Sequence, residues 1–166
     1  MELTIRAMKS SDWESVAAIF REGIELKTST FHTEVPSYEA WDAAHTPDCR
    51  LVAEAEGKVI GWASLQPYSS RKVYAGVAEV SIYIKTEYRG RKIGERLLRT
   101  LVEESEKQGY WTLQSGIFEI NRASIAIHEK VGFRLVGCRE RIGKDSNGIW
   151  QNTVLMERRS NKAGLC

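Results

Sequence analysis

The chain has 166 residues, of which 28% are charged and 42% hydrophobic. Since a domain usually takes about 100–200 residues, we expect a single domain over residues 1–166, with a flexible tail from about residue 160. The 24 Lys and Arg balance 22 Asp and Glu to a net charge of +2, which argues against a nucleic-acid or anionic-membrane partner. No apolar run approaches the roughly 18 residues of a membrane span.

The cysteines and the N-terminus indicate a reducing compartment. Residues 1–6 lack the basic and then apolar run of a secretory signal. Cys49, Cys138 and Cys166 lie far apart, with no C-x-x-C pair and no histidine at metal-ligand spacing. We therefore expect reduced thiols in a cytoplasmic protein without a bound metal.

The first third of the chain predicts one strand and two helices. Residues 3–7 alternate as an edge strand does. Ser11 followed by Glu14 is typical of a capping box, and the helix that it opens should end before Thr28. A second, short helix is capped by Ser37. The apolar positions of the first helix recur at helical spacing: Val16, Ile19, Phe20, Gly23 and Ile24.

In the rest of the chain, segments with the apolar spacing of strands alternate with segments that have the apolar spacing of helices. Glu56-Gly57 predicts a tight hairpin turn between the first two of three consecutive strands. The expected strands are residues 50–55, 58–66, 78–84, 111–118, 134–142 and 149–158, and the expected helices are 91–108 and 123–131. Because strands outnumber helices and do not strictly alternate with them, the order favours an α+β domain with a mixed sheet.

The strand at residues 78–84 should present a polar face. Side chains alternate along a strand, so Glu79, Ser81 and Tyr83 point away from the apolar side. With helices on both sides of the sheet, this face would look into a polar cleft.

A basic turn follows that strand. Arg89, Arg91 and Lys92 stand at the start of a long helix, where free N–H groups and the helix dipole favour an anion such as a phosphate pair. A solvated turn is the alternative. The glycine patterns of ATP- and dinucleotide-binding loops are absent.

A second polar pattern lies on the helix at residues 123–131. At about 100° per residue, Asn121 and His128 share one face, with Ser124 between them. Asn121 also suits a structural helix cap, and His128 taken alone also suits a partly buried structural histidine.

Taken together, these residues resemble the GNAT superfamily of acetyl-CoA-dependent N-acetyltransferases. The superfamily signature is [QR]-x-x-G-x-[GA], and the segment from Arg89 to Gly94 fits it except that Lys92 replaces the first glycine. A side chain there is tolerable if φ stays negative. Asn-x-x-Ser-x-x-x-His-x-x-x-Gly-Phe, from residue 121, adds to the resemblance.

Further motifs resemble the phosphinothricin and methionine sulfoximine or sulfone acetyltransferases of that superfamily. His128 stands where many relatives have Tyr, whereas Asn152 departs from the Trp-x-Asp pattern common near the C-terminus of this branch. The shared motifs are Ser29-Thr30-Phe31, Arg71-x-x-Tyr74, Glu79-x-Ser81-x-Tyr83, Leu135-x-Gly137 and Gly148-x-Trp150.

The resemblance implies a GNAT-type fold. Its central sheet is mixed but mostly antiparallel, a splayed strand holds the pantetheine arm of acetyl-CoA, and helices cover both faces. It implies cofactor contacts from Ile82, Tyr83, Ile84, Arg89, Gly90, Arg91, Lys92, Ile93, Gly94, Glu95, Asn121 and Lys130.

The resemblance also implies the chemistry. A primary amine attacks the thioester, and Glu79 is the candidate base that takes its proton, directly or through one water. A purely amine-binding role for Glu79 is the alternative. A strand N–H near Ile82 would hold the oxyanion, and His128 could give a proton to the departing thiolate.

The substrate implied is a small amino acid with a phosphinate, sulfoximine or sulfone side chain, such as phosphinothricin or methionine sulfone. Its carboxylate calls for cations near Glu79. The resemblance points to Arg71, Lys72, Val73 and Tyr74, with Phe31 and Thr30 as pocket wall; solvated loop charges are the alternative for Arg71 and Lys72.

Other assignments remain open at this stage. The amine could belong to a peptide N-terminus, a polyamine or an aminoglycoside, or the chain could bind acetyl-CoA without turnover. Nucleic-acid binding through the basic turn is disfavoured by the near-neutral charge. The branch leans towards homodimers, with the C-terminal strands as the expected contact.

Overall fold

The computed structural model describes residues 1–166, and the elements follow the predicted order. They are β1 (Leu3–Ala7), α1 (Trp13–Leu26), α2 (Tyr38–Ala44), β2 (Leu51–Ala55), β3 (Lys58–Pro67), β4 (Val77–Ile84), α3 (Ile93–Lys107), β5 (Thr112–Phe118), α4 (Arg122–Lys130), β6 (Arg134–Lys144) and β7 (Trp150–Arg159). The predicted α+β class is confirmed.

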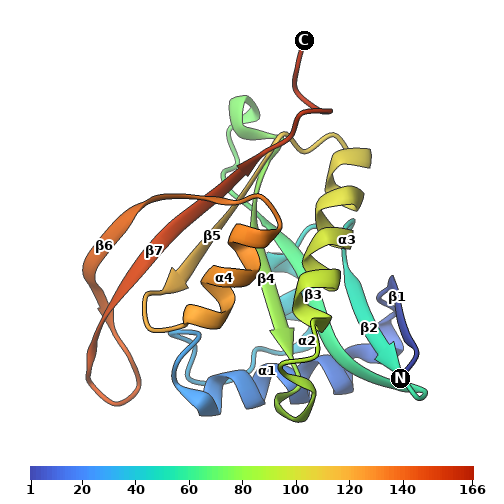
Figure 1. Ribbon diagram of the computed structural model, residues 1–166, viewed down its shortest axis with the longest axis vertical. Coiled ribbons are helices and arrows are strands. Elements are labelled where there is room, and N and C mark those ends of the chain that lie inside the picture. Colours follow the sequence, from blue (N-terminus) through green and yellow to red (C-terminus); the bar gives the residue numbers. More distant parts are fainter.

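All seven strands form one sheet in the order β1-β2-β3-β4-β5-β7-β6. Every neighbouring pair is antiparallel except β4 and β5, which run parallel and pair only over residues 77–79 and 112–114. Beyond these residues the two strands diverge, and Figure 1 shows the opening that results. The sheet is therefore mostly antiparallel and splayed at its centre.

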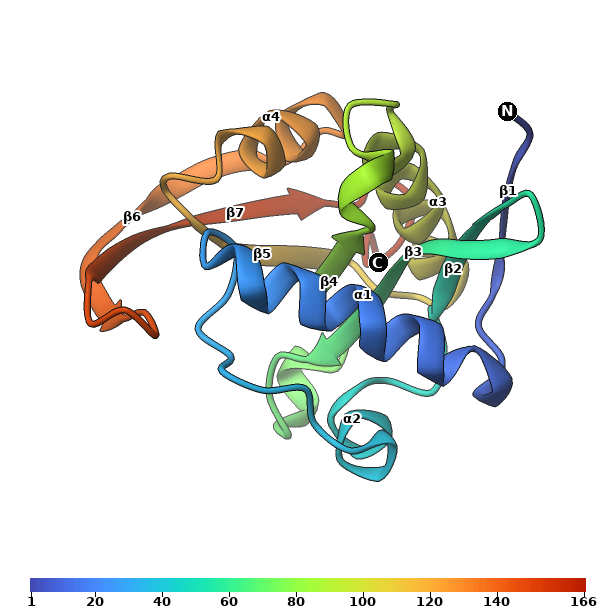
Figure 2. The same cartoon turned by 90° about the horizontal axis from the view of Figure 1, so that it is seen from below.

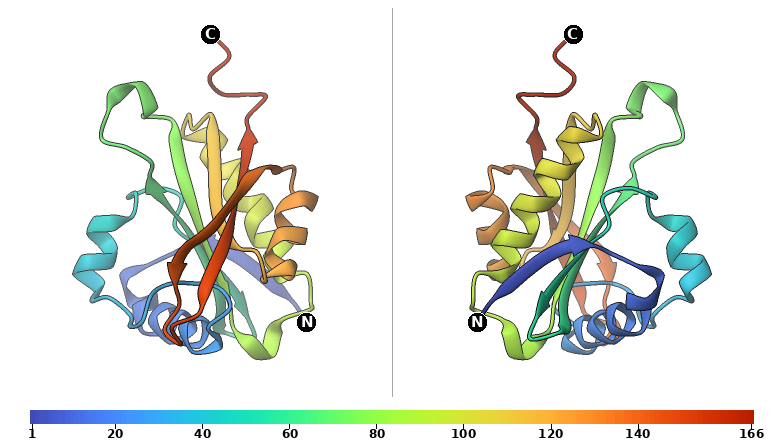
Figure 3. Two further views of the ribbon diagram at one scale, coloured as in Figure 1. Left: turned by 90° about the vertical axis from the view of Figure 1, so that its left-hand side faces the viewer. Right: turned by 90° about the vertical axis from the view of Figure 1, so that its right-hand side faces the viewer.

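Helices cover both faces of this sheet. Figure 2 shows α1 and α2 on one side and α3 and α4 on the other, and the side views in Figure 3 show the same arrangement. Each face has its own buried cluster. The cluster under α3 includes Leu97, Leu101 and Ile60, whereas the cluster under α1 and α2 is aromatic, with Phe20 and Trp62 at its centre.

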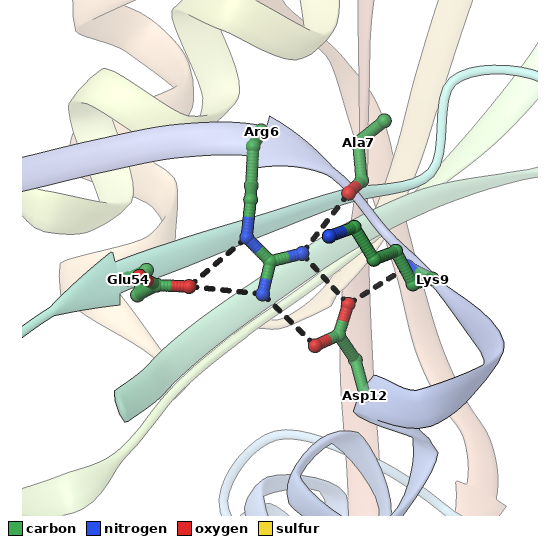
Figure 4. A network of polar contacts seen from close by, with 5 residues as sticks. All are labelled: Arg6, Ala7, Lys9, Asp12 and Glu54. Carbon is green, nitrogen blue, oxygen red and sulfur yellow. Dashed lines mark hydrogen bonds and ion pairs between the residues drawn. The ribbon is translucent and has the colours of Figure 1, made fainter. Parts of the chain in front are cut away.

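The start of α1 corrects one prediction. The Ser11 side chain makes no capping hydrogen bond, and Asp12, the residue before α1, makes none to that helix; instead Asp12 Oδ2 accepts a hydrogen bond from the backbone N–H of Lys9 at 2.7 Å and closes the preceding 3₁₀ turn. The same carboxylate forms an ion pair with Arg6 at 2.8 Å, and Arg6 also pairs with Glu54 on β2 at 2.9 Å. This network, drawn in Figure 4, ties β1, β2 and the entry to α1 together.

Other local signals act as predicted. The Ser37 side chain accepts from the N–H of Ala40 at 3.2 Å and caps α2. The turn between β2 and β3 has φ of 53° at Glu56 and 74° at Gly57, the two positive values that a type I′ hairpin turn requires.

The segment predicted as a flexible tail is anchored at its beginning. Ser160 is buried; its N–H donates to the carbonyl of Trp111 at 2.9 Å, and its Oγ donates to Glu106 and accepts from the N–H of Lys162 at 3.0 Å. All three cysteines are free. None of the helices combines the length and the hydropathy needed to cross a membrane.

Candidate active site

The opening between β4 and β5 holds a cavity of about 270 Å³. Residues from both faces of the sheet line it, because the strands are apart from Val80 and Ser115 onwards and the cavity extends between them. The lining residues are Ser29, Thr30, Phe31, His32, Gln66, Glu79, Val80, Ser81, Ile82, Tyr83, Ser115, Gly116, Ile117, Phe118, Asn121, Ser124, His128 and Thr153.

The face towards α1 carries the predicted carboxylate. Glu79, Ser81 and Tyr83 line the cavity from this face; Val80 also lines it, but with Ala78 it belongs to the buried cluster on the opposite face. Glu79 also lies beside the gap: a Cβ on Gly116 of β5 would be 3.9 Å from its Oε1. A carboxylate here can accept a proton or bind an ammonium group.

Tyr83 forms a rigid wall on this face. Its ring stacks on Phe20 at 4.9 Å and on Trp62 at 5.0 Å between centroids. Gly23 of α1 permits the approach, because a Cβ there would lie 2.6 Å from the Tyr83 ring. Burial raises the pKa of Tyr83, so the phenol stays neutral.

The face towards α4 carries Asn121, Ser115 and His128. The Asn121 side-chain oxygen accepts from the N–H of Ser124 at 3.2 Å and caps α4, while its amide NH₂ makes no hydrogen bond within the protein; the residue also lines the cavity. The structural alternative foreseen for Asn121 is therefore real, and both roles are compatible. His128 is only 1% exposed.

The hydrogen bonds of His128 define which nitrogen carries its proton. Nδ1 lies 2.7 Å from the carbonyl oxygen of Ser124, and because a carbonyl only accepts, Nδ1 is the donor. Nε2 lies 2.8 Å from Oγ of Ser115 and is the acceptor of the neutral ring. Burial lowers the pKa of His128. Neutral His128 thus offers a lone pair at Nε2, and it must first take up a proton before it can give one to a thiolate.

The entry to α3 has the features of an anion site. No side chain caps the helix, and the N–H groups of residues 90–95 find no acceptor within the protein. Gly90 and Lys92 have φ of 78° and 62°. A side chain at this position was expected to be tolerable if φ stayed negative, and this condition is not met: Lys92 adopts the left-handed conformation that the usual glycine would adopt without strain.

These features together correspond to one known family. The sequence matches the Acetyltransferase (GNAT) family over residues 13–133. The chain is a GNAT acetyltransferase. The expectation raised by the two sequence motifs is confirmed, and the splayed sheet and the cavity belong to a GNAT domain.

Curated relatives and solved structures show which GNAT enzymes this chain is similar to. The chain is 30% identical to the phosphinothricin N-acetyltransferase of Alcaligenes faecalis, over 95% of this chain and 83% of the relative. It is 26% identical to an L-methionine sulfoximine/L-methionine sulfone acetyltransferase of Pseudomonas paraeruginosa, over 95% and 94%. The crystal structure of a GNAT superfamily phosphinothricin acetyltransferase from Sinorhizobium meliloti in complex with AcCoA has a TM-score of 0.90 at 29% identity, covering 100% of this chain and 92% of that one.

A solved relative whose name gives a different substrate is similar to a comparable degree. The ribosomal-protein-alanine N-acetyltransferase of Brucella melitensis has a TM-score of 0.87 at 30% identity, covering 95% of this chain and 99% of that one.

Other predicted contacts of the GNAT domain lie outside the cavity. Ile84, Lys130 and the turn from Arg89 to Glu95 do not line it. Glu95 forms an ion pair with Arg99 at 3.0 Å, which lowers the pKa of Glu95. Arg99 in turn donates to the carbonyl of Lys130 at 3.1 Å, so the first turn of α3 and the end of α4 are linked.

The predicted substrate residues separate into two places. Phe31 lines the cavity and packs on Phe118 at 4.5 Å between ring centroids. Arg71, Lys72, Val73 and Tyr74 form an exposed loop and 3₁₀ turn before β4, where the Arg71 guanidinium lies 5.6 Å from the Tyr74 ring centroid. They do not line the cavity of their own chain, and neither does any other Lys or Arg.

Four polar lining residues went unrecognised in the sequence: His32, between α1 and α2, and three residues on strands. Gln66, Ser115 and Thr153 come from β3, β5 and β7. A signal for Ser115 exists: alternation places it between buried Leu113 and Ile117, as the only hydroxyl on that apolar side. No group of three or more His, Cys, Asp and Glu side chains could hold a metal ion.

Proposed function

We propose that this GNAT acetyltransferase transfers the acetyl group of acetyl-CoA to the α-amino group of a small amino acid or analogue, such as phosphinothricin, methionine sulfoximine or methionine sulfone. The observation that carries the proposal is the cavity that joins both faces of the sheet, with Glu79 on one face and Asn121 and His128 on the other. The similarity to the two groups of curated relatives supports this substrate class.

The chain can hold acetyl-CoA as its co-substrate at sites that fit its chemistry. The unpartnered N–H groups of residues 90–95 suit the pyrophosphate, with Arg89, Arg91 and Lys92 adding positive charge. Ile82, Tyr83 and Ile84 lie beyond the last residue that pairs with β5, so their backbone groups on that side can bind the pantetheine amides. Asn121 and Lys130 would add contacts from α4.

Glu79 is the proposed general base. An α-amino group has a pKa near 8 and is mostly ammonium at neutral pH, so one proton must leave before the nitrogen can attack. Glu79 accepts this proton, directly or through a water, and a strand N–H near Ile82 stabilises the negative charge that develops on the carbonyl oxygen.

The proposed role of the loop before β4 in substrate binding depends on one condition. An amino-acid carboxylate needs a cation, and none lines the cavity of the same chain. Arg71 and Lys72 can serve only if their loop closes over the cavity or a second copy presents it. Replacing each by alanine should raise KM for methionine sulfone; an unchanged KM in both variants would remove this loop, with Val73 and Tyr74, from the substrate site.

We also propose a homodimer in the cytoplasm. The outer strand β6 and the start of β7 expose large apolar side chains, among them Leu135 at 57% and Trp150 at 53%, and such patches are typical of protein contacts. Free thiols suit a reducing compartment. Light scattering on the purified protein tests the oligomeric state.

One screen tests the reaction and its main rival. Free thiol is measured after acetyl-CoA is mixed with amino acids, methionine sulfone, methionine sulfoximine, phosphinothricin, spermidine and a peptide beginning with alanine. Thiol release with the small amino acids supports the proposal. Release with the peptide alone favours N-terminal acetylation, the function of the Brucella relative. Absence of release, with no heat of acetyl-CoA binding by calorimetry, would overturn both.

Glu79 is tested separately. The Glu79→Gln variant should lose about 100-fold in kcat, because general base catalysis contributes on the order of 10²–10⁴. Glu119→Gln is a matched control, since Glu119 does not line the cavity. If Glu79→Gln keeps kcat and raises only KM, Glu79 binds the amine and is no base.

A further inference from the structure

Ser115 contacts the buried imidazole of His128 at the edge of the cavity. The residue is 3% exposed, and its hydroxyl oxygen lies 2.8 Å from Nε2 of His128. The imidazole is fixed from two other directions: the Ser124 carbonyl accepts from Nδ1 at 2.7 Å, and the Phe133 ring packs edge-on at 4.9 Å between centroids. Both Ser115 and His128 line the cavity.

The Ser124 carbonyl determines which groups donate and which accept in the hydrogen bonds of His128. Since Nδ1 donates to Ser124, Nε2 can only accept, so the Ser115 hydroxyl donates its proton to Nε2. The lone pairs of Ser115 Oγ then remain free for a group in the cavity. This is the arrangement in which a hydroxyl can accept a proton on one side while it passes its own proton to an imidazole on the other.

We propose that Ser115 is a catalytic residue that relays one proton from the attacking amine to His128 and then to the leaving sulfur. The inference rests on the proposed function. As the C–N bond forms, Ser115 Oγ takes a proton from the nitrogen and its own proton moves to Nε2. As the C–S bond breaks, Nε2 returns that proton to Ser115, which protonates the sulfur. One proton has moved from nitrogen to sulfur, and both residues regain their starting forms.

The relay gives the two faces of the sheet separate tasks. Glu79 is on the face towards α1 and removes the extra proton of the ammonium, whereas Ser115 and His128 are on the face towards α4. The groups that hydrogen-bond to His128 or pack a ring against it are Ser115 from β5, Ser124 from α4 and Phe133; none of them is charged. Burial lowers the pKa of His128, so the imidazole is neutral at neutral pH and holds the proton only briefly.

The chain offers a matched control for the test. Ser64 on β3 is also fully buried and also contacts a histidine, with its Oγ 2.6 Å from Nδ1 of His45, but neither residue lines the cavity. We expect Ser115→Ala to lower kcat about 100-fold with KM for both substrates little changed. Ser64→Ala should leave kcat as in the unmodified enzyme.

Three further readouts separate a relay from a structural role. Ser115→Thr, which keeps the hydroxyl, should recover most of kcat. His128→Gln and the double variant Ser115→Ala/His128→Gln should lose as much as Ser115→Ala alone, because residues that act as a unit are not additive. The solvent deuterium isotope effect on kcat should fall in Ser115→Ala.

The outcomes distinguish the relay from the reaction itself. Full kcat in Ser115→Ala, or losses that multiply in the double variant, would overturn the relay and leave the proposed function standing. If unmodified enzyme binds acetyl-CoA but releases no thiol with any amine, the proposed function falls and the relay with it.

Discussion

The protein contains two buried serine–histidine pairs, one on each side of the sheet. His45, at the end of α2, contacts Ser64 at 2.6 Å and stacks on Trp41 at 4.3 Å between centroids. His128, on α4, contacts Ser115 at 2.8 Å. Burial lowers the pKa of both histidines, that of His45 to about 4. By composition, burial and protonation the two pairs are alike.

Their surroundings differ in the respect that matters for chemistry. The pair of His45 is enclosed by the aromatic side chains under α1 and α2, whereas the pair of His128 borders the cavity at the splayed strands. A buried serine–histidine pair is thus no signature of catalysis by itself. Access to a cavity, and a carbonyl that defines the acceptor nitrogen, distinguish the pair that we propose to react from the enclosed pair.

The most direct way to break this comparison is to remove each imidazole in turn. His128→Gln should lower kcat about 100-fold, as expected for loss of a group that transfers a proton. His45→Gln should leave kcat unchanged at 25 °C while it lowers Tm. Steady-state kinetics and thermal unfolding on both variants measure this, and equal kcat losses would show that the pairs do not differ in function.

The pH dependence of stability tests one property that the two pairs share, a buried neutral histidine, through His45. In the unfolded state the pKa of His45 is near 6.5, and in the folded state it is about 4. Between these pH values the unfolded state therefore binds more protons than the folded state. The stability that depends on neutral His45 is therefore fully present above about pH 6.5 and is lost as the pH falls. At pH 5 His45 alone should have cost about 2 kcal/mol of unfolding free energy, measurable by urea unfolding. A fall of the same size in His45→Gln would assign the effect to other groups.

A substitution remote from both pairs shows what lost stability alone does to activity. Asp12→Asn should weaken the ion pair with Arg6 and cost about 1–2 kcal/mol, since hydrogen bonds between charged groups contribute about 1.5–3 kcal/mol and Arg6 is partly exposed. Urea unfolding measures the loss, and kcat at 25 °C should be unchanged. A kcat loss as large as that of His128→Gln would mean that activity merely follows stability.

The smallest effect should have the opposite sign. Lys92 has φ of 62°, and a non-glycine residue in that region costs roughly 1 kcal/mol. Lys92→Gly should therefore raise Tm by about 2–4 °C and weaken acetyl-CoA binding slightly, most at low salt, because one cation is lost. A lower Tm would show that the Lys92 side chain stabilises the fold by contacts that outweigh its strain.

Local signals in the sequence predict most of the fold. Ser37 and Glu56-Gly57 act through neighbours within a few residues, so their caps and turns follow from the chain alone. The capping box predicted at Ser11 does not form. Asp12 instead bonds the nearby backbone of Lys9, and through Arg6 it joins Glu54 on β2, a partner that only the folded sheet brings there.

The site was predictable in part for the same reason. Glu79, Asn121 and His128 lie in contiguous motifs whose alternation or helical spacing shows which face they share. Alternation along β5 marks Ser115 as a hydroxyl on the apolar side, but its contact with His128 depends on how β5 packs against α4, which no short pattern contains. The distance of Arg71 and Lys72 from the cavity likewise depends on how a loop leaves the sheet.

The cavity between β4 and β5 also has a kinetic consequence. Since the cavity reaches residues on both faces, an acyl donor lying along α3 and α4 need not depart before an amine enters from the side of α1. Under the proposed function both ligands then occupy the enzyme at once, so double-reciprocal plots at several fixed concentrations of the second ligand should intersect instead of running parallel.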